Sequence, residues 1–244
     1  MQLHKEGSLR WLSFELLDDA GLINAVILKP FNMAIEKAYN LAEIRQNFEI
    51  VKQQFKLEKI SYASQIHTDT IFSVDKNSPT FECDALMTQE KGLGLLMMHA
   101  DCQIACFYDP VKKVVATAHA GWRGNIKRLY TKTISRMKEK FQSHPCDILV
   151  AISPSLGPQF SEFCSWAKEW PPEFWHHIKE PFHIDLWQIA QEELLSAGIL
   201  SHHLQIARIC TYENKDDFFS FRRKVHEQGP CIVRETGATF ISLS

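Results

Sequence analysis

Several features that define other protein classes are missing from this sequence, and each absence narrows the choice. No stretch approaches the roughly 18 consecutive apolar residues that a membrane-spanning helix needs. Residues 1–11 lack the apolar core of a signal peptide, so we expect a cytoplasmic protein. The net charge is only −2, which gives no electrostatic basis for binding nucleic acid.

The cysteines also lack the pattern of a disulfide framework. There are 7 of them, an odd number with irregular spacing and no CxxC pair, so most are expected to be buried small side chains. The chain has no internal repeat, no low-complexity tract and no Gly/Ser linker. We therefore expect the 244 residues to form one domain.

Helices and strands are expected to alternate along the chain. Apolar runs predict buried strands at residues 92–98, 103–108, 114–118 and 147–153. Amphipathic spacing and capping residues predict one helix starting near Asn40 and another between Asp185 and Gly198. Because strands outnumber helices and the two interleave, residues 1–244 are predicted to form a single α/β domain of layered, mixed β-sheets flanked by helices.

Residues 98–125 concentrate the side chains with chemical potential. Two apolar runs flank Asp109-Pro110, which has the composition of a tight turn, and together they predict a β-hairpin. With the turn centred after Pro110, Cys102 would lie directly opposite His119, with Cβ atoms about 4.5–5.5 Å apart. A thiolate and an imidazole at that separation can share one zinc ion.

A glycine-flanked stretch follows the hairpin at residues 121–124. It leads to Asn125, a residue type favoured at helix N-caps, and apolar residues then repeat every three or four positions up to Phe141. This pattern predicts an amphipathic helix whose N-terminal N–H groups favour anions. Arg123 adds a bidentate donor suited to phosphate or carboxylate.

Cys102 and His119 admit three interpretations that spacing alone does not separate. With His67, which follows a predicted strand, they would supply three metal ligands and leave a fourth position open for water, as in catalytic zinc sites. Alternatively, Cys102 is a nucleophile and His119 its base, and the adjacent Asp101 is a further catalytic candidate. In the third interpretation the pair belongs to the core of a hairpin.

Two other stretches could contribute to a site. Residues 218–223 form an aromatic-basic cluster in which Arg222 and its neighbour could clamp a phosphate or stack on a base, although a surface ion pair is an equal alternative. Trp166, Trp170 and Trp175 either pack in the core or present a stacking surface.

Several short motifs occur in a characteristic order. They are QIH (65–67), DALMT (84–88), HADC (99–102), YDP (108–110), HAGWRG (119–124), SPSLGP (153–158), CTY (210–212) and FFSFRR (218–223). With this set, roughly residues 60 to 223 resemble the YfiH/laccase-domain family, once called multicopper polyphenol oxidases. The combination of HAGWRG with ADC is highly specific for that family.

The resemblance implies a single α/β domain with a zinc site of one Cys and two His. By position these ligands would be His67, Cys102 and His119. The implied activity is purine nucleoside chemistry, namely phosphorolysis of adenosine, inosine, guanosine or methylthioadenosine and deamination of adenosine. Purine nucleosides and phosphate would be the binding partners, with Arg123 and Arg222 as substrate-binding residues.

Parts of the chain depart from the family pattern. Residues 25–33 stand where members carry Thr-Arg and a Gly-Gly-x-Ser stretch, so an expected substrate-binding Arg is missing. Thr68 replaces the Gly after the motif His, residues 159–161 lack the usual Cys and Tyr, and Ala238 replaces the Arg of a Thr-Gly-Arg. We therefore expect an intact metal site beside an altered substrate pocket.

Three alternatives to the nucleoside enzyme follow from these departures and from the ligand types. One is a Cys-dependent hydrolase or amidase, and another is a non-catalytic metal-binding module that kept the site and lost the pocket. Copper oxidation of phenols is the weakest, because multicopper chemistry needs many more histidines than the motifs offer.

Overall fold

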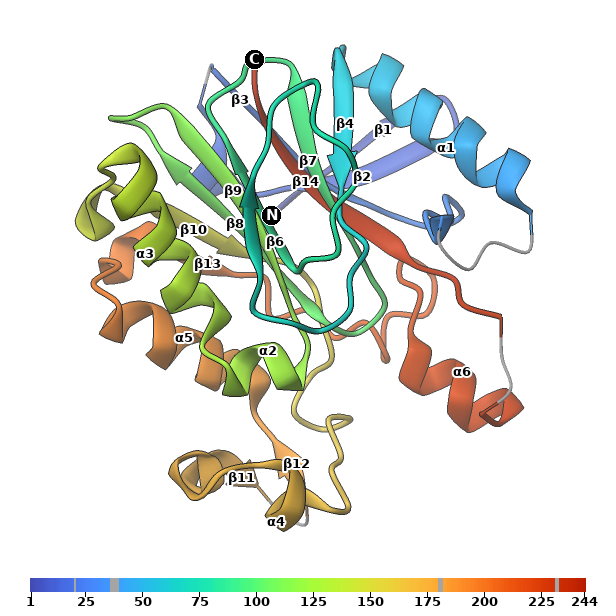
Figure 1. Cartoon of the computed structure of the whole chain (residues 1–244). Coiled ribbons are helices and arrows are strands. Elements are labelled where there is room, and N and C mark those ends of the chain that lie inside the picture. The colour runs from blue at the N-terminus through green and yellow to red at the C-terminus, as the bar shows by residue number, and fades with distance from the viewer. Residues whose placement is uncertain (20, 36–39, 180–181, 231–232) are drawn as a thin grey trace.

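Two six-stranded sheets form the centre of the molecule (Figure 1). The computed structural model describes residues 1–19, 21–35, 40–179, 182–230 and 233–244. The first sheet has the order β1 (Gln2–Glu6), β2 (Leu9–Ser13), β3 (Leu22–Ile27), β14 (Gly237–Leu243), β7 (Leu93–His99), β4 (Lys59–Tyr62). The second has the order β13 (Leu204–Ile206), β10 (Leu149–Ile152), β8 (Gln103–Asp109), β9 (Val114–Ala120), β6 (Ala85–Thr88), β5 (Ile71–Ser73).

Both sheets are mixed. The pairs β4–β7, β10–β13 and β5–β6 run parallel, and the other neighbours run antiparallel. The strands β7, β8 and β9 are buried along their whole length, as their nearly continuous apolar sequences predict. The α/β fold class predicted from the sequence is confirmed.

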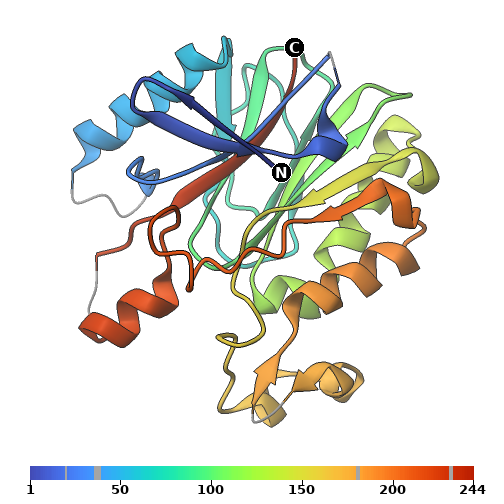
Figure 2. The same cartoon turned by 180° about the vertical axis from the view of Figure 1, so that it is seen from behind.

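The core has three apolar layers that separate sheets and helices. One lies between the two sheets and contains side chains from both, such as Leu95 and Ile104. A second lies between the β8–β9 sheet and the helices α3 (Leu129–Phe141) and α5 (Leu186–Ser196). The third lies between the other sheet and α1 (Leu41–Gln54), so helices cover both outer faces (Figures 1 and 2).

Two helices begin where capping residues predict. The Asn40 side chain accepts from the Glu43 backbone N–H at 3.3 Å at the start of α1. Asp185 accepts from the Gln188 N–H at 3.0 Å at the start of α5. In both places a short side-chain acceptor satisfies an N–H that the first turn leaves free.

The helix after the hairpin differs from the prediction. The short helix α2 (Trp122–Ile126) begins directly after Gly121, and α3 starts only after Arg128, which adopts a left-handed conformation. Asn125 therefore lies inside α2, where its buried amide donates to the Gly121 carbonyl at 3.1 Å. The prediction that Asn125 caps one continuous helix is wrong, because its side chain donates to a carbonyl four residues earlier and does not accept from an N–H of the next turn.

The predicted hairpin register is also wrong. His119 pairs with Ile104, and Gln103 pairs with Ala120, so Cys102 precedes β8 rather than facing His119. The Asp109 carboxylate accepts from two turn N–H groups, those of Val111 at 2.8 Å and Lys112 at 2.9 Å. These bonds and a left-handed Lys113 (φ 54°) centre the turn one residue later than predicted.

A small lobe extends from one end of the sheets, below α2 in Figure 1. It contains α4 (Trp166–Glu169), the 3₁₀ helix η4 (Pro172–His177) and the strand pair β11 (Ile178–Lys179) and β12 (His183–Ile184). Trp170 is 2% exposed in its core, whereas Trp175 is 42% exposed. The three tryptophans thus divide between packing and surface and do not form one stacking platform.

The remaining elements connect these parts. They are η1 (Glu15–Leu17), η3 (Pro145–Asp147), η5 (Ser201–His203) and α6 (Phe221–Gln228). None of the helices in the described ranges is long and apolar enough to cross a membrane.

Candidate metal centre

Three side chains from separate segments meet at one end of the two sheets. His67 lies in the loop after β4, Cys102 lies just before β8, and His119 lies on β9. The ligand atoms of these residues all lie within 4.8 Å of one another. The structure therefore brings together the three metal ligands predicted from the sequence, despite the different hairpin register.

Gly121 explains how Cys102 and His67 can approach so closely. A Cβ atom at Gly121 would lie 3.1 Å from the Cys102 Sγ and 3.0 Å from the His67 Cδ2. Both distances are shorter than ordinary contacts of about 3.5–4.0 Å. The absent side chain leaves the space into which the thiol and the imidazole point.

Asp84 holds two of the ligand-bearing segments in place. One carboxylate oxygen accepts from the His119 Nδ1 at 2.7 Å, and the other accepts from the Thr68 N–H at 2.6 Å. Since Asp84 is fully buried, these bonds fix the His119 ring with Nε2 directed away from the carboxylate. A carboxylate behind a histidine is the usual support of a metal ligand.

Electrostatics favour the ligand form of the cysteine. Burial alone would raise the pKa of Cys102, but the charge and hydrogen bonds of His119 and His67 outweigh it and lower the pKa to about 6. Burial alone would lower the pKa of His119, but Cys102 and Asp84 outweigh it and raise the pKa to about 9. Cys102 is therefore a thiolate at neutral pH, which is the form that binds metals.

Two residues at this centre have strained backbones. His67 has φ 61° and Asp101 has φ 89°, conformations that residues other than glycine adopt at a cost of about 1–3 kcal/mol each. The Thr68–Asp84 bond holds the first of these turns. Such strain is concentrated at sites where geometry matters more than stability.

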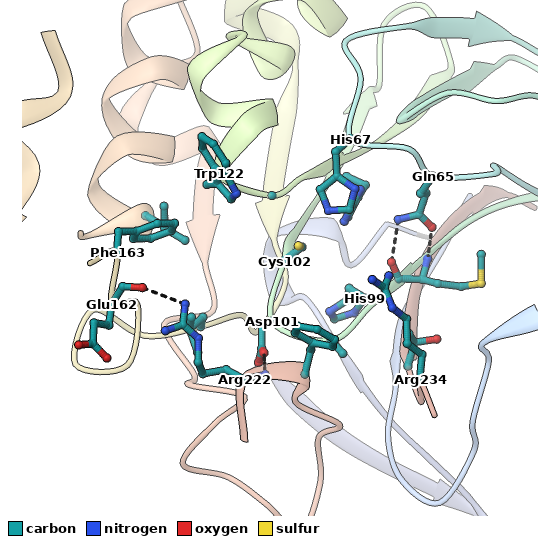
Figure 3. A pocket seen from close by; sticks show the side chains of 18 of the residues that line it. Gln65, His67, His99, Asp101, Cys102, Trp122, Glu162, Phe163, Arg222 and Arg234 are labelled. Carbon is teal, nitrogen blue, oxygen red and sulfur yellow. Dashed lines mark hydrogen bonds between the residues drawn. The ribbon is translucent and has the colours of Figure 1, made fainter. Parts of the chain in front are cut away.

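The three candidate ligands line a cavity of about 580 Å³, a size typical of small-molecule sites. Figure 3 shows Trp122 and Phe163 on one side of the Cys102 thiol, and Gln65 and Arg234 on the other. The first side also carries Glu162 and Arg222 beside these two rings, which we call the aromatic wall, so polar groups lie on both sides of the cavity. This arrangement suits a ligand with a flat ring and a polar or charged end.

Asp101 and Arg222 are joined in the cavity wall. Asp101 is buried, accepts from the Thr211 hydroxyl at 2.7 Å and accepts from the Arg222 backbone N–H at 2.7 Å. Burial raises the pKa of Asp101. The Arg222 guanidinium lies in the cavity wall and donates to the Glu162 carbonyl at 3.0 Å. Asp101 thus anchors the start of α6 and with it the position of Arg222.

Arg123 lies outside the cavity lining. Its side chain is exposed, and the guanidinium carbon lies 4.1 Å from the Trp122 ring centroid. The sequence suggested an anion-binding Arg at a helix N-terminus, but the early start of α2 turns this side chain towards solvent. Its contact instead supports the outer face of Trp122.

Sequence reasoning missed several residues of the site. Asp84 stands in a quoted motif, and its only signal was a carboxylate at the start of a buried strand. His99 lines the cavity, and its Nδ1 has no hydrogen-bond partner within the described residues, while Nε2 contacts the Thr239 hydroxyl at 2.9 Å. Burial lowers the pKa of His99 to about 3, so the ring is neutral.

Together, fold and site define an α/β protein of two packed sheets with a Cys-His₂ centre at the bottom of a ligand-sized cavity. Residues 20–234 match the family described as "Multi-copper polyphenol oxidoreductase laccase", and the chain belongs to that family. Its resemblance to the YfiH/laccase-domain proteins is therefore confirmed.

Named relatives make the comparison more specific. A purine nucleoside phosphorylase of Borreliella burgdorferi is 31% identical over 237 residues, which are 91% of this chain and 95% of that protein. A purine nucleoside phosphorylase of Bacteroides thetaiotaomicron is 34% identical over 149 residues, 57% of this chain and 55% of that protein, so this match spans about half of the relative's length. The crystal structure of YlmD from Geobacillus stearothermophilus shares the fold, with a TM-score of 0.86 at 24% identity over 99% of this chain and 98% of that one.

Proposed function

We propose that this protein is a zinc-dependent purine nucleoside enzyme. Its reactions are the phosphorolysis of adenosine, inosine, guanosine or methylthioadenosine, and the deamination of adenosine. The observation that carries the proposal is the meeting of His67, Cys102 and His119 in a cavity that is lined by aromatic rings and by polar side chains. Relatives that bear the name purine nucleoside phosphorylase support it.

The ligand set fits zinc. One thiolate and two imidazoles are ligands that zinc prefers, and three protein ligands are the number found in catalytic zinc sites. The carboxylate of Asp84 supports His119 from behind, and the space at Gly121 is kept free for the ligand side chains. When bound, zinc supplies a Lewis acid that stabilises negative charge developing on an oxygen atom.

The aromatic wall suits a purine base. Trp122 and Phe163 line the cavity with ring centroids 6.2 Å apart and ring planes inclined by 68°. A purine has two apolar faces that aromatic side chains bind by stacking or edge contact. On the other side, Gln65 and Arg234 supply polar groups for a nucleoside.

Phosphate and the ribose end of the substrate fit the two arginines of the cavity. Arg222 and Arg234 both line it, and the Arg234 guanidinium carbon lies 5.2 Å from the Phe221 ring centroid. Guanidinium groups bind phosphate through pairs of parallel hydrogen bonds. The two lie on opposite sides of the Cys102 thiol in Figure 3, and we assign the phosphate to one of them rather than to the exposed Arg123.

A nucleoside panel tests the proposal. Metal-free and zinc-loaded protein would be incubated with each nucleoside, with and without phosphate, and the products separated by chromatography. We expect free base and the corresponding sugar 1-phosphate only with zinc and phosphate. With zinc alone, we expect adenosine and water to give inosine and ammonia. Cys102→Ser should abolish both, whereas Cys164→Ser, a cysteine in the same cavity wall, should leave both intact. If zinc-loaded protein converts no purine nucleoside, the proposal fails.

A second candidate is a Cys-dependent hydrolase or amidase. The low pKa of Cys102 and the adjacent His119 favour it, because a thiolate paired with an imidazolium is an activated nucleophile. This activity would be lost on alkylation of Cys102 and would withstand chelators. The zinc enzyme would be inactivated by chelators and restored by zinc.

A further inference from the structure

A second cluster of metal-ligand types lies in the small lobe, away from the Cys-His₂ centre. His176 and His177 end η4, and Glu192 lies on the facing surface of α5. Their ligand atoms all lie within 4.8 Å of one another. No motif of the sequence analysis includes these residues, and the proposed nucleoside chemistry does not use them.

The two contacts between the histidines and Glu192 are long for hydrogen bonds and are compatible with shared coordination of one ion. The same Glu192 oxygen, Oε2, lies 3.3 Å from the His177 Nε2 and 3.5 Å from the His176 Nε2. Hydrogen bonds between nitrogen and oxygen are usually about 2.7–3.2 Å long. Two ligand atoms of a tetrahedral zinc, each about 2.0–2.2 Å from the ion, are about 3.4 Å apart.

The surroundings prepare the ligands. Gln188 donates to the other Glu192 oxygen at 2.9 Å, which orients the carboxylate as an outer-shell partner of a metal ligand does. The side chain of His177 is only 5% exposed, so its ring is held against the protein. His176, with a ring centroid 3.9 Å from that of His177, is 63% exposed and leaves the cluster open to solvent.

We propose that His176, His177 and Glu192 form a second site for a divalent ion of the zinc type, which ties η4 to α5. Two imidazoles and one carboxylate suit Zn²⁺, and water can complete the coordination. This proposal is independent of the nucleoside activity.

Such an ion would also act on the cavity through packing. Phe174 of η4 contacts Trp170 at a centroid distance of 5.4 Å, and Trp170 contacts Phe163 at the same distance. Phe163 lies in the aromatic wall of the cavity. Fixing η4 on α5 therefore restrains that wall through one continuous row of rings.

Another cluster of the described residues is less suitable. In His144, Cys146 and Asp147 the distance from the His144 Nδ1 to the Cys146 Sγ is 2.9 Å. A nitrogen and a sulfur bound to one tetrahedral zinc would be about 3.6 Å apart. That cluster is a local contact along η3, and it serves as the comparison in the experiment.

Titration of the full, metal-free chain with Co²⁺ tests the proposal. Cobalt at the Cys-His₂ centre produces a sulfur-to-metal charge-transfer band, whereas cobalt bound by two His and a Glu gives only ligand-field absorption. We expect two equivalents per chain, one of each kind. His176→Ala and Glu192→Gln should each lower the affinity for the Co²⁺ equivalent that lacks the charge-transfer band by more than about 10-fold. Neither should change the equivalent that gives the band.

The controls isolate the site. Cys102→Ser should remove the charge-transfer equivalent and keep the other. His202→Ala changes another adjacent histidine pair, with ring centroids 4.4 Å apart, and should keep both. The proposal is overturned if every Co²⁺ ion that the wild-type chain binds gives the charge-transfer band. It is also overturned if Cys146→Ser removes the Co²⁺ equivalent that lacks this band and His176→Ala does not.

Discussion

Replacing Gly121 by alanine tests the geometry of the Cys-His₂ centre with a single methyl group. Gly121 has φ −73°, which any residue adopts, so the substitution adds no backbone strain. The new methyl carbon would lie 3.0 Å from the His67 Cδ2 and 3.1 Å from the Cys102 Sγ. Its effect is therefore steric and falls on two ligands.

The size of the effect follows from these distances. Ordinary carbon contacts are about 3.5–4.0 Å, so the two ligand side chains must move by about half an ångström. Metal sites tolerate deviations of only about 0.2 Å in ligand distance. We expect zinc affinity to fall about 10- to 100-fold, which is about 1.4–2.8 kcal/mol of binding free energy.

Competition against a chromophoric chelator measures the zinc affinity, and urea denaturation measures the free energy of unfolding of the metal-free protein. The latter should change by less than about 1 kcal/mol, because alanine also restricts the unfolded chain. Gly124→Ala is the matched control, since its Cβ would meet the Ala120 Cβ at 3.2 Å and the His119 backbone oxygen at 3.5 Å, but no ligand side chain. If Gly121→Ala bound zinc with wild-type affinity, this would refute the inference that Gly121 leaves the space that the Cys102 and His67 side chains need.

Three further predictions concern charge. Asp84→Asn should weaken zinc binding about 10- to 100-fold, because one amide oxygen cannot accept both bonds that Asp84 accepts. In metal-free protein, alkylation of Cys102 should rise around pH 6, where its lowered pKa lies, whereas alkylation of Cys164 should rise at a higher pH because the neighbouring Glu162 carboxylate raises its pKa. Burial raises the pKa of Glu193 from 4.5 to about 7, so the folded chain binds this proton more tightly than the unfolded chain. Protonated Glu193 therefore contributes about 3 kcal/mol to the free energy of unfolding below pH 4.5, and this contribution is lost as the pH rises through 7. Glu193→Gln should remove this pH dependence.

Each of these predictions has its own control. For Asp84→Asn the control is Asp69→Asn. Asp69 is an exposed carboxylate in the loop that carries His67, and it pairs with Lys132, so this change should leave zinc affinity unchanged. Added zinc should protect Cys102 from alkylation, read by mass spectrometry of the peptides, and should leave Cys164 reactive. Urea denaturation at several pH values follows the third prediction, and equal slopes for wild type and Glu193→Gln between pH 4.5 and 7 would contradict it.

Local patterns in the sequence were sufficient for several parts of this protein. The apolar run ending at Met98 predicted a buried strand, and the capping pair of Asp185 and Gln188 predicted the start of α5, because both depend on neighbours in the chain. The motif residues His67, Cys102 and His119 were selected as ligands by residue type and by family resemblance. The class of fold and the family followed from the same information.

Only the tertiary structure decided how these parts meet. The register of the β8–β9 hairpin depends on side-chain bonds of Asp109 inside the turn, and a shift of one residue changed which side chains face each other. Asp84 supports His119 across 35 positions of the chain. Likewise, Arg234 lines the cavity and Arg123 does not, and no local pattern in the sequence predicts this difference.

The physical reason is the range of the interactions involved. Helix caps and strand periodicity arise from contacts within a few residues, so the sequence alone determined them. The second histidine cluster, the support of the ligands and the walls of the cavity arise where segments pack that are distant in the chain. Their positions depend on sheet pairing and helix packing, which the folded structure alone decides.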